Sequence, residues 1–126
     1  MTGETEFNSY RDLKVWQAAM AIAVRCYAET RSFPREELFG LTSQIRRSAG
    51  SIAANIAEGP GRETTGAFIQ FLRTAQGSTK ELETHLILAQ RVNLMPQAEA
   101  EALLAAADEI GKMLRALIRS LEKRVQ

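Results

Sequence analysis

The pattern of apolar positions along the chain predicts four long amphipathic helices and no strand. The clearest pattern covers residues 41–59, where apolar side chains recur at steps of three and four, as on one face of a helix. These apolar positions are Leu41, Ile45, Ala49, Ile52 and Ile56. The polar side chains beside them are Gln44, Arg47, Ser48, Ser51, Asn55 and Glu58. Because Ser and Asn are poor helix formers in water, we expect this polar row to face hydrogen-bonding partners.

Capping residues and prolines predict where the first two helices begin and end. Ser9-Tyr10-Arg11-Asp12 has the form of a capping box, so we expect the first helix to begin there. It should continue to about Thr30 and stop before Pro34, because proline disfavours helical geometry in the preceding residue. The second helix should close at Gly59-Pro60-Gly61, where the second glycine allows the loop to turn freely.

Similar signals bound the third and fourth helices. Thr64 or Thr65 should cap a helix that runs to about Arg91, and Pro96 suits the first turn of the last helix. Gly77 is costly inside a helix, so we expect it to mark a close helix approach. Four long helices with short connections favour an all-α fold, an antiparallel up-and-down four-helix bundle.

The first predicted helix is apolar over more of its circumference than one bundle core requires. One seam consists of Leu13, Trp16, Met20, Ala23 and Tyr27. A second seam consists of Val15, Ala19, Ile22 and Cys26. We expect the second seam, or part of it, to contact a neighbouring subunit, because a single core cannot cover both.

Composition limits the chain to one domain of modest size. Its 126 residues, 45% of them apolar, suit a single domain over residues 1–126, with a flexible tail at residues 1–8. Sixteen Lys and Arg oppose fifteen Asp and Glu, so the net charge of +1 demands no polyanionic partner and any basic surface must be local. No segment resembles a membrane span or a secretory signal, and Cys26 alone excludes a disulfide framework. A buried thiol in a reducing cytoplasm fits this composition.

The chain offers little catalytic chemistry. His85 is its one histidine, which excludes a histidine cluster for zinc and leaves Cys26 without an obvious catalytic partner. The glycines of residues 59–61 match neither a dinucleotide-binding fingerprint nor a Walker loop, and no strand precedes them. We therefore expect no enzyme, no metal and no cofactor.

Polar residues of the second and third helices form a candidate structural network. Its members are Gln44, Arg47, Ser51, Asn55, Glu58 and Glu81. Arg47 should pair with a carboxylate of the second or third helix. Ser51, Asn55 and Ser78 should hydrogen-bond across helix contacts and fix their register. A general acid and base pair is the alternative, but it would need a cleft and an unmatched carboxylate.

Basic residues form the candidate nucleic-acid surface. The candidates are Arg46, Arg62, Arg73, Lys112, Arg115 and Arg119. The last three lie in the second half of the fourth helix, whose first half is acidic. This polarity equally suits a solvated helix with charges that complement its dipole. If nucleic acid binds, we expect phosphate contacts, because no base-reading motif is present.

Several separated blocks resemble one bacterial family. The blocks are Tyr10–Gln17, Phe33-Pro34, Leu41–Arg47, Ser51-Ile52, Asn55–Gly59, Arg62, Phe71-Leu72 and Gly77–Glu83. Together they resemble the four-helix-bundle family whose founding members are encoded in intervening sequences of large-subunit ribosomal RNA genes. The resemblance covers roughly residues 10–94 and implies a ring-shaped homopentamer without an established enzymatic activity.

A related branch of this family includes accessory proteins of diversity-generating retroelements. These proteins are similar to basic pentameric barrels that bind RNA or DNA and a reverse transcriptase. The resemblance therefore implies a nucleic-acid-binding oligomeric accessory protein, with a protein partner such as a reverse transcriptase. The alternative is a structural scaffold that binds a protein partner without nucleic acid.

Overall fold

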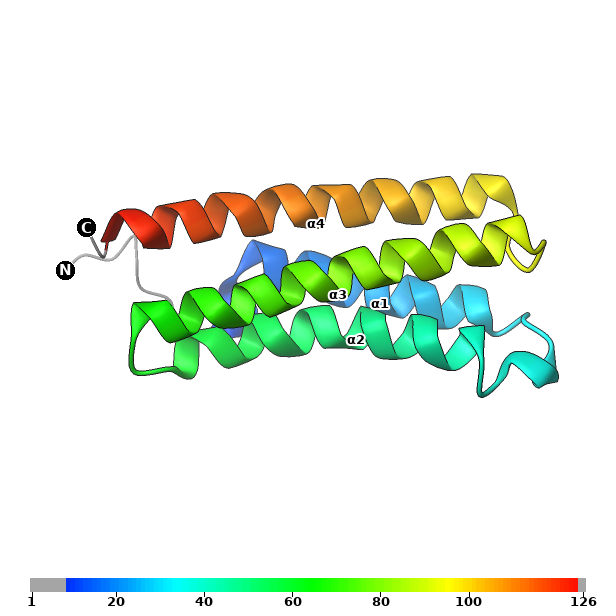
Figure 1. Ribbon diagram of the computed structural model, residues 1–126, viewed down its shortest axis with the longest axis horizontal. Coiled ribbons are helices and arrows are strands. Elements are labelled where there is room, and N and C mark those ends of the chain that lie inside the picture. Colours follow the sequence, from blue (N-terminus) through cyan, green and yellow to red (C-terminus); the bar gives the residue numbers. More distant parts are fainter. Residues whose placement is uncertain (1–8, 125–126) are drawn as a thin grey trace.

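The computed structural model describes residues 9–124 as four antiparallel helices (Figure 1). These helices are α1 (Lys14–Thr30), α2 (Leu41–Glu58), α3 (Thr65–Arg91) and α4 (Gln97–Arg124). Consecutive helices pack side by side, and α4 closes the bundle against α1. No strand occurs in residues 9–124, so the expected four-helix bundle is confirmed. The predicted tail, residues 1–8, lies outside the described residues.

The core is built from the apolar seams of all four helices. The largest fully buried side chains include Ile22, Ile45, Ile52, Ile56, Leu72, Leu82, Leu86, Leu103, Ile110, Leu114 and Leu121. Together with the smaller buried residues, they recur in each helix mainly at steps of three or four, so one face of every helix points to a common axis. Their burial supplies the main driving force for assembly of the bundle.

The second seam of α1 faces the core of its own chain rather than a neighbouring subunit. The seam assigned to a subunit contact is buried within the chain: Val15, Ala19, Ile22 and Cys26 are each at most 5% exposed. In the other seam, Ala23 is buried and Leu13 and Trp16 pack against the core. Met20 and Tyr27 of the same seam are 40% and 48% exposed. The predicted subunit contact of Val15, Ala19, Ile22 and Cys26 is therefore wrong. α1 packs against both α2 and α4, and periodicity along α1 alone cannot show which of its seams these helices cover.

The first helix also begins later than predicted. Ser9 accepts a hydrogen bond from the backbone N–H of Arg11, but it caps only a 3-10 turn over Tyr10–Asp12. Leu13 then has an extended backbone (φ −71°, ψ 124°), and the α-helix starts at Lys14. The edge of the Tyr10 ring meets the Trp16 ring at a centroid distance of 5.4 Å, which anchors this turn on α1.

An ordered loop connects α1 to α2. Phe33 is buried against the core, and a 3-10 turn follows over Arg35–Glu37. The Glu37 carboxylate accepts a hydrogen bond of 3.0 Å from the backbone N–H of Leu41, so it caps the first turn of α2. Between these two fixed points, Leu38 and Phe39 point into solvent and are 49% and 91% exposed.

The other connections follow the predicted boundaries closely. A 3-10 turn over Gly59–Gly61 ends α2, and Thr64 caps α3 by accepting a 3.1 Å hydrogen bond from the N–H of Ala67. No glycine in the described residues has a positive φ, so the free turn expected at Gly61 is wrong. Asn93 instead makes the sharp turn after α3, with a φ of 66°.

The close helix approach lies at Gly59 rather than at Gly77. A Cβ atom on Gly59 would come within 2.5 Å of the Phe68 ring of α3, whereas a Cβ on Gly77 would meet nothing within 4 Å. The prediction for Gly77 is therefore wrong within the chain. Gly59 lets the end of α2 pack directly against an aromatic ring.

We predict opposite effects for alanine at these two glycines. Gly59→Ala should lower the free energy of unfolding by about 1–3 kcal/mol, because the added methyl group overpacks the contact with Phe68. Gly77→Ala should raise it by about 0.5–1 kcal/mol, because alanine favours the helix and the site is open. Denaturant unfolding at one fixed protein concentration measures both, and equal effects would contradict the assignment.

Candidate functional site

The polar row of α2 meets α3 in two separate clusters. In the first, the Arg47 guanidinium donates to Gln44 Oε1 (2.8 Å) and forms an ion pair with Glu81 of α3. The same Glu81 carboxylate lies 3.3 Å from His85 Nε2. The sequence indicates only that His85, as the one histidine, cannot belong to a histidine cluster. Its spacing of four residues from Glu81 is the signal that could have placed it here.

The charge of Arg47 determines the electrostatics of this cluster. Chiefly through its hydrogen bond, Arg47 holds the pKa of the Glu81 carboxyl below its usual value, and His85 adds to the effect. Both members of the ion pair remain in contact with water, since the Arg47 side chain is 53% exposed and that of Glu81 is 37% exposed. The cluster is therefore a surface ion pair, and it confirms the expected partner of Arg47 on the third helix.

The second cluster joins two serines across the same helix contact. Ser51 Oγ and Ser78 Oγ lie 2.8 Å apart, and Ser78 is buried. Asn55 donates to the backbone carbonyl of Ser51 (2.9 Å) and to its hydroxyl (3.1 Å), so its bonds stay within α2. The serine pair fixes the register of α2 against α3, while the amide supports the serine.

Glu58 lies outside both clusters. It forms an ion pair with Arg62 one turn later, and Arg62 also stacks on the Phe71 ring at 4.7 Å from its centroid. The predicted network is thus three local groups.

The candidate basic residues divide into engaged and unengaged groups. Arg46 donates to the hydroxyl of Thr30 (2.9 Å) and stacks on Tyr27, 4.6 Å from the ring centroid, so it joins α2 to α1. Arg73 pairs with Glu122 at 2.8 Å, and Lys112 lies 3.5 Å from Asp108. Like Arg62, these side chains already have partners within the chain.

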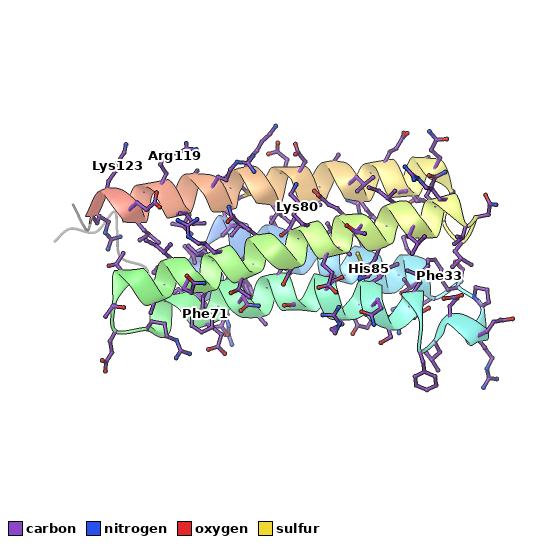
Figure 2. All side chains as sticks on the ribbon, viewed as in Figure 1. Phe33, Phe71, Lys80, His85, Arg119 and Lys123 are labelled. Atoms are coloured by element: carbon purple, nitrogen blue, oxygen red, sulfur yellow. The ribbon has the colours of Figure 1, made fainter. Side chains whose placement is uncertain are left out.

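Arg115 and Arg119 are different. Both are exposed on the C-terminal half of α4, and no ion pair joins either to another described residue. Lys123 continues the series one turn later, and Figure 2 shows Arg119 and Lys123 pointing away from the rest of the bundle. We call Arg115, Arg119 and Lys123 the α4 basic stripe. Lys123 is not among the candidates predicted from the sequence, although its spacing of four residues from Arg119 is visible there.

Two other titratable groups lie close to the core. Burial raises the pKa of the Cys26 thiol to about 12, so the thiol stays protonated. The pKa of Glu29 on α1 is also raised. Burial is the main cause, and a hydrogen bond with Glu99 of α4 is the second. No group of three or more His, Cys, Asp or Glu side chains within residues 9–124 is placed to hold a metal.

One shallow hollow lies beside the α3–α4 connection. Its lining contains Ser32, Gln90, Asn93, Pro96 and Gln97, together with Leu94 and Met95. None of these side chains ionises, so the hollow offers hydrogen bonds but no acid, base or charged ligand-binding group.

Comparison with known proteins identifies the family. Residues 11–116 match the profile of the 23S rRNA-intervening sequence protein family. The chain belongs to this family. The match includes the polar row, Glu81, His85 and the first residue of the α4 basic stripe, and this confirms the family resemblance seen in the sequence.

A solved structure supports the same assignment. A crystal structure of a protein with unknown function from the S23 ribosomal protein family of Bacteroides thetaiotaomicron VPI-5482 is 29% identical to this family member, with a TM-score of 0.78. The alignment covers 84% of this chain and 96% of that one. No curated protein matches the chain. These comparisons establish the family and the fold rather than an activity.

Hydropathy gives no sign of a membrane-spanning element in this family member. Within the described residues, every helix is too short or too polar to cross a bilayer.

We predict that the Arg47–Glu81 ion pair contributes little to stability. A double-mutant cycle of Arg47→Ala and Glu81→Ala should give a coupling of at most about 1 kcal/mol at pH 7, because water screens both groups. Since Glu81 has a lowered pKa in the folded protein, the coupling should be lost as the pH falls through that value. A coupling above about 3 kcal/mol would instead show a pair shielded from water.

Proposed function

We propose that this protein is a non-enzymatic, self-associating accessory protein that binds the phosphate backbone of RNA or DNA through the α4 basic stripe. The observation that carries the proposal is the stripe itself. Its three cations lie on the exposed side of one helix at steps of four residues, without an ion-pair partner among residues 9–124.

The stripe has a geometry suited to a charged polymer. Four helical residues rise about 6 Å, so the three cations extend over about 12 Å along the helix surface. Exposed Arg and Lys side chains can contact successive phosphates without reading base identity. The four engaged candidates would have to give up existing contacts before they could bind phosphate. This cost favours the stripe over Arg46, Arg62, Arg73 and Lys112 as the first contact.

Self-association would make this modest surface effective. A chain with a net charge of +1 and three cations in the α4 basic stripe attracts nucleic acid weakly. Repetition of the stripe around a ring, such as the homopentamer implied by the family resemblance, would let one nucleic acid contact several stripes at once. A reducing, cytoplasmic location is compatible with the buried and unpaired state of Cys26.

We predict salt-dependent and sequence-tolerant binding. Affinity for single-stranded and structured RNA should fall steeply with salt, and RNAs of different sequence should compete equally. The double variant Arg115→Gln and Arg119→Gln should bind more weakly. It should also reduce the slope of log K against log salt by about 0.7 per lost single-strand contact. Fluorescence anisotropy titrations at several salt concentrations measure both quantities.

A matched variant controls for net charge. The double variant Arg31→Gln and Arg35→Gln also removes two positive charges, but from exposed positions just after the C-terminal end of α1. It should therefore retain most of the affinity. Equal weakening by both double variants would exclude a localised site. Absence of binding at low salt would favour a scaffold that binds a protein partner, and strong sequence discrimination would reveal base readout.

A further inference from the structure

We infer that the loop bearing Leu38 and Phe39 inserts into the exposed apolar stripe of α1 on a second copy of this chain. This contact rests on the proposed self-association and specifies which surfaces form it. Its two components lie on different parts of one chain, and neither is covered within the described structure.

The first component is an apolar knob formed by Leu38 and Phe39. Phe39 is 91% exposed, although the loop around it is ordered on both sides. Phe33 anchors the loop in the core, and Glu37 caps α2 just beyond the knob. The backbone N–H groups of Glu37, Leu38 and Gly40 are all hydrogen-bonded within the loop. A large aromatic side chain held this way loses little conformational entropy on binding, as in the anchor residues of protein interfaces.

The second component is an apolar stripe on the outer face of α1. Met20, Val24 and Tyr27 follow one another at steps of four and three, and Val24 is 65% exposed. Arg46 of α2 stacks on Tyr27 and holds the ring in place. One turn along α2 from Arg46, Gly50 contributes no side chain, and a Cβ there would meet nothing within 4 Å. The surface beside the stripe is therefore open enough to receive a protruding side chain.

A second copy accounts for both components at once. Both surfaces are apolar and exposed, so one contact between two copies would remove the knob and the stripe from water together. Each copy would insert its knob into the stripe of one neighbour and receive the knob of the other neighbour in its own stripe. The knob and the stripe of every subunit would then both be buried. Such a head-to-tail contact can close into a ring with an odd number of subunits, which a two-fold symmetric contact alone cannot build.

Position along the bundle agrees with a ring of side-by-side subunits. Figure 1 places the α1–α2 connection and the C-terminal end of α1 at the same end of the bundle. Val24 and Tyr27 belong to the last two turns of α1. Neighbouring bundles at the same height would therefore bring the knob of one to the level of Val24 and Tyr27 on the next.

Disulfide trapping between two single variants tests the contact. Phe39→Cys and Val24→Cys would be co-expressed, one with a larger tag, and then oxidised mildly. We expect a mixed disulfide dimer, because paired Cys require Cβ atoms about 4 Å apart. Cys26 can stay in place, since it is buried and its thiol has a pKa of about 12. Non-reducing electrophoresis and peptide mass spectrometry identify the linkage.

A cysteine at Leu88 is the matched control. Leu88 lies on α3 and is 46% exposed, similar to Tyr27, so Phe39→Cys with Leu88→Cys should yield no linkage. In parallel, Phe39→Ser should raise the dissociation constant of the assembly by about tenfold or more, with Leu88→Ser close to the parent. Light scattering across a concentration series measures this change, and an unchanged melting profile of the diluted subunit shows that folding is preserved.

The outcomes separate this contact from the proposed function. A Val24→Cys variant that cross-links to itself would overturn the contact in favour of a symmetric α1 pairing. An assembled parent without the mixed disulfide would overturn the contact while self-association and RNA binding stand. A monomeric parent would overturn both self-association and the contact, and the RNA titration would then report on the single stripe.

Discussion

Burial of one apolar seam on each helix fixes the direction of almost every other side chain in this protein. Once Ile22, Ile52, Leu82 and Leu114 share a core, the flanks of each helix are determined by helical geometry. The flanks of α2 and α3 then meet with serines, Arg47 and Glu81, whereas the outer side of α4 is left with its cations. The site residues are thus consequences of core packing, and none of them is needed to drive it.

The spacing of apolar residues was sufficient to predict the four helices, because in each helix the pattern is long and is bounded by capping residues, glycine or proline. It failed on α1 because two apolar seams have nearly equal strength there, and only the positions of α2 and α4 choose between them. It also failed at Gly77, where the cost of a glycine was visible but the surroundings were not. The close approach at Gly59 depends on Phe68, which reaches it only after the chain has reversed direction.

The contacts of the charged residues can likewise be predicted from the sequence when the partners are one turn apart, whereas contacts between different helices also depend on how the helices pack. Pairs one turn apart, such as Glu58 and Arg62 or Glu81 and His85, can be seen in the sequence through their spacing. The contact of Arg73 with Glu122 spans 49 positions and requires the register of α3 against α4. Contacts distant in sequence engage Arg46 and Arg73, two of the six basic candidates, so counting cations along the chain could not show that these two already have partners.

The unequal lengths of α1 and α4 have a consequence for local dynamics. α1 has 17 residues and α4 has 28, which correspond to about 26 Å and 42 Å of helix. Glu29 at the end of α1 lies beside Glu99 at the start of α4, and α1 runs antiparallel to α4 from there. Because α1 is shorter, it does not extend as far as the last turns of α4. Those turns have fewer helical neighbours than the rest of the bundle and should open more readily, so their amides should exchange with solvent first. The part of α4 that is expected to exchange first is therefore also the part that carries Arg119 and Lys123.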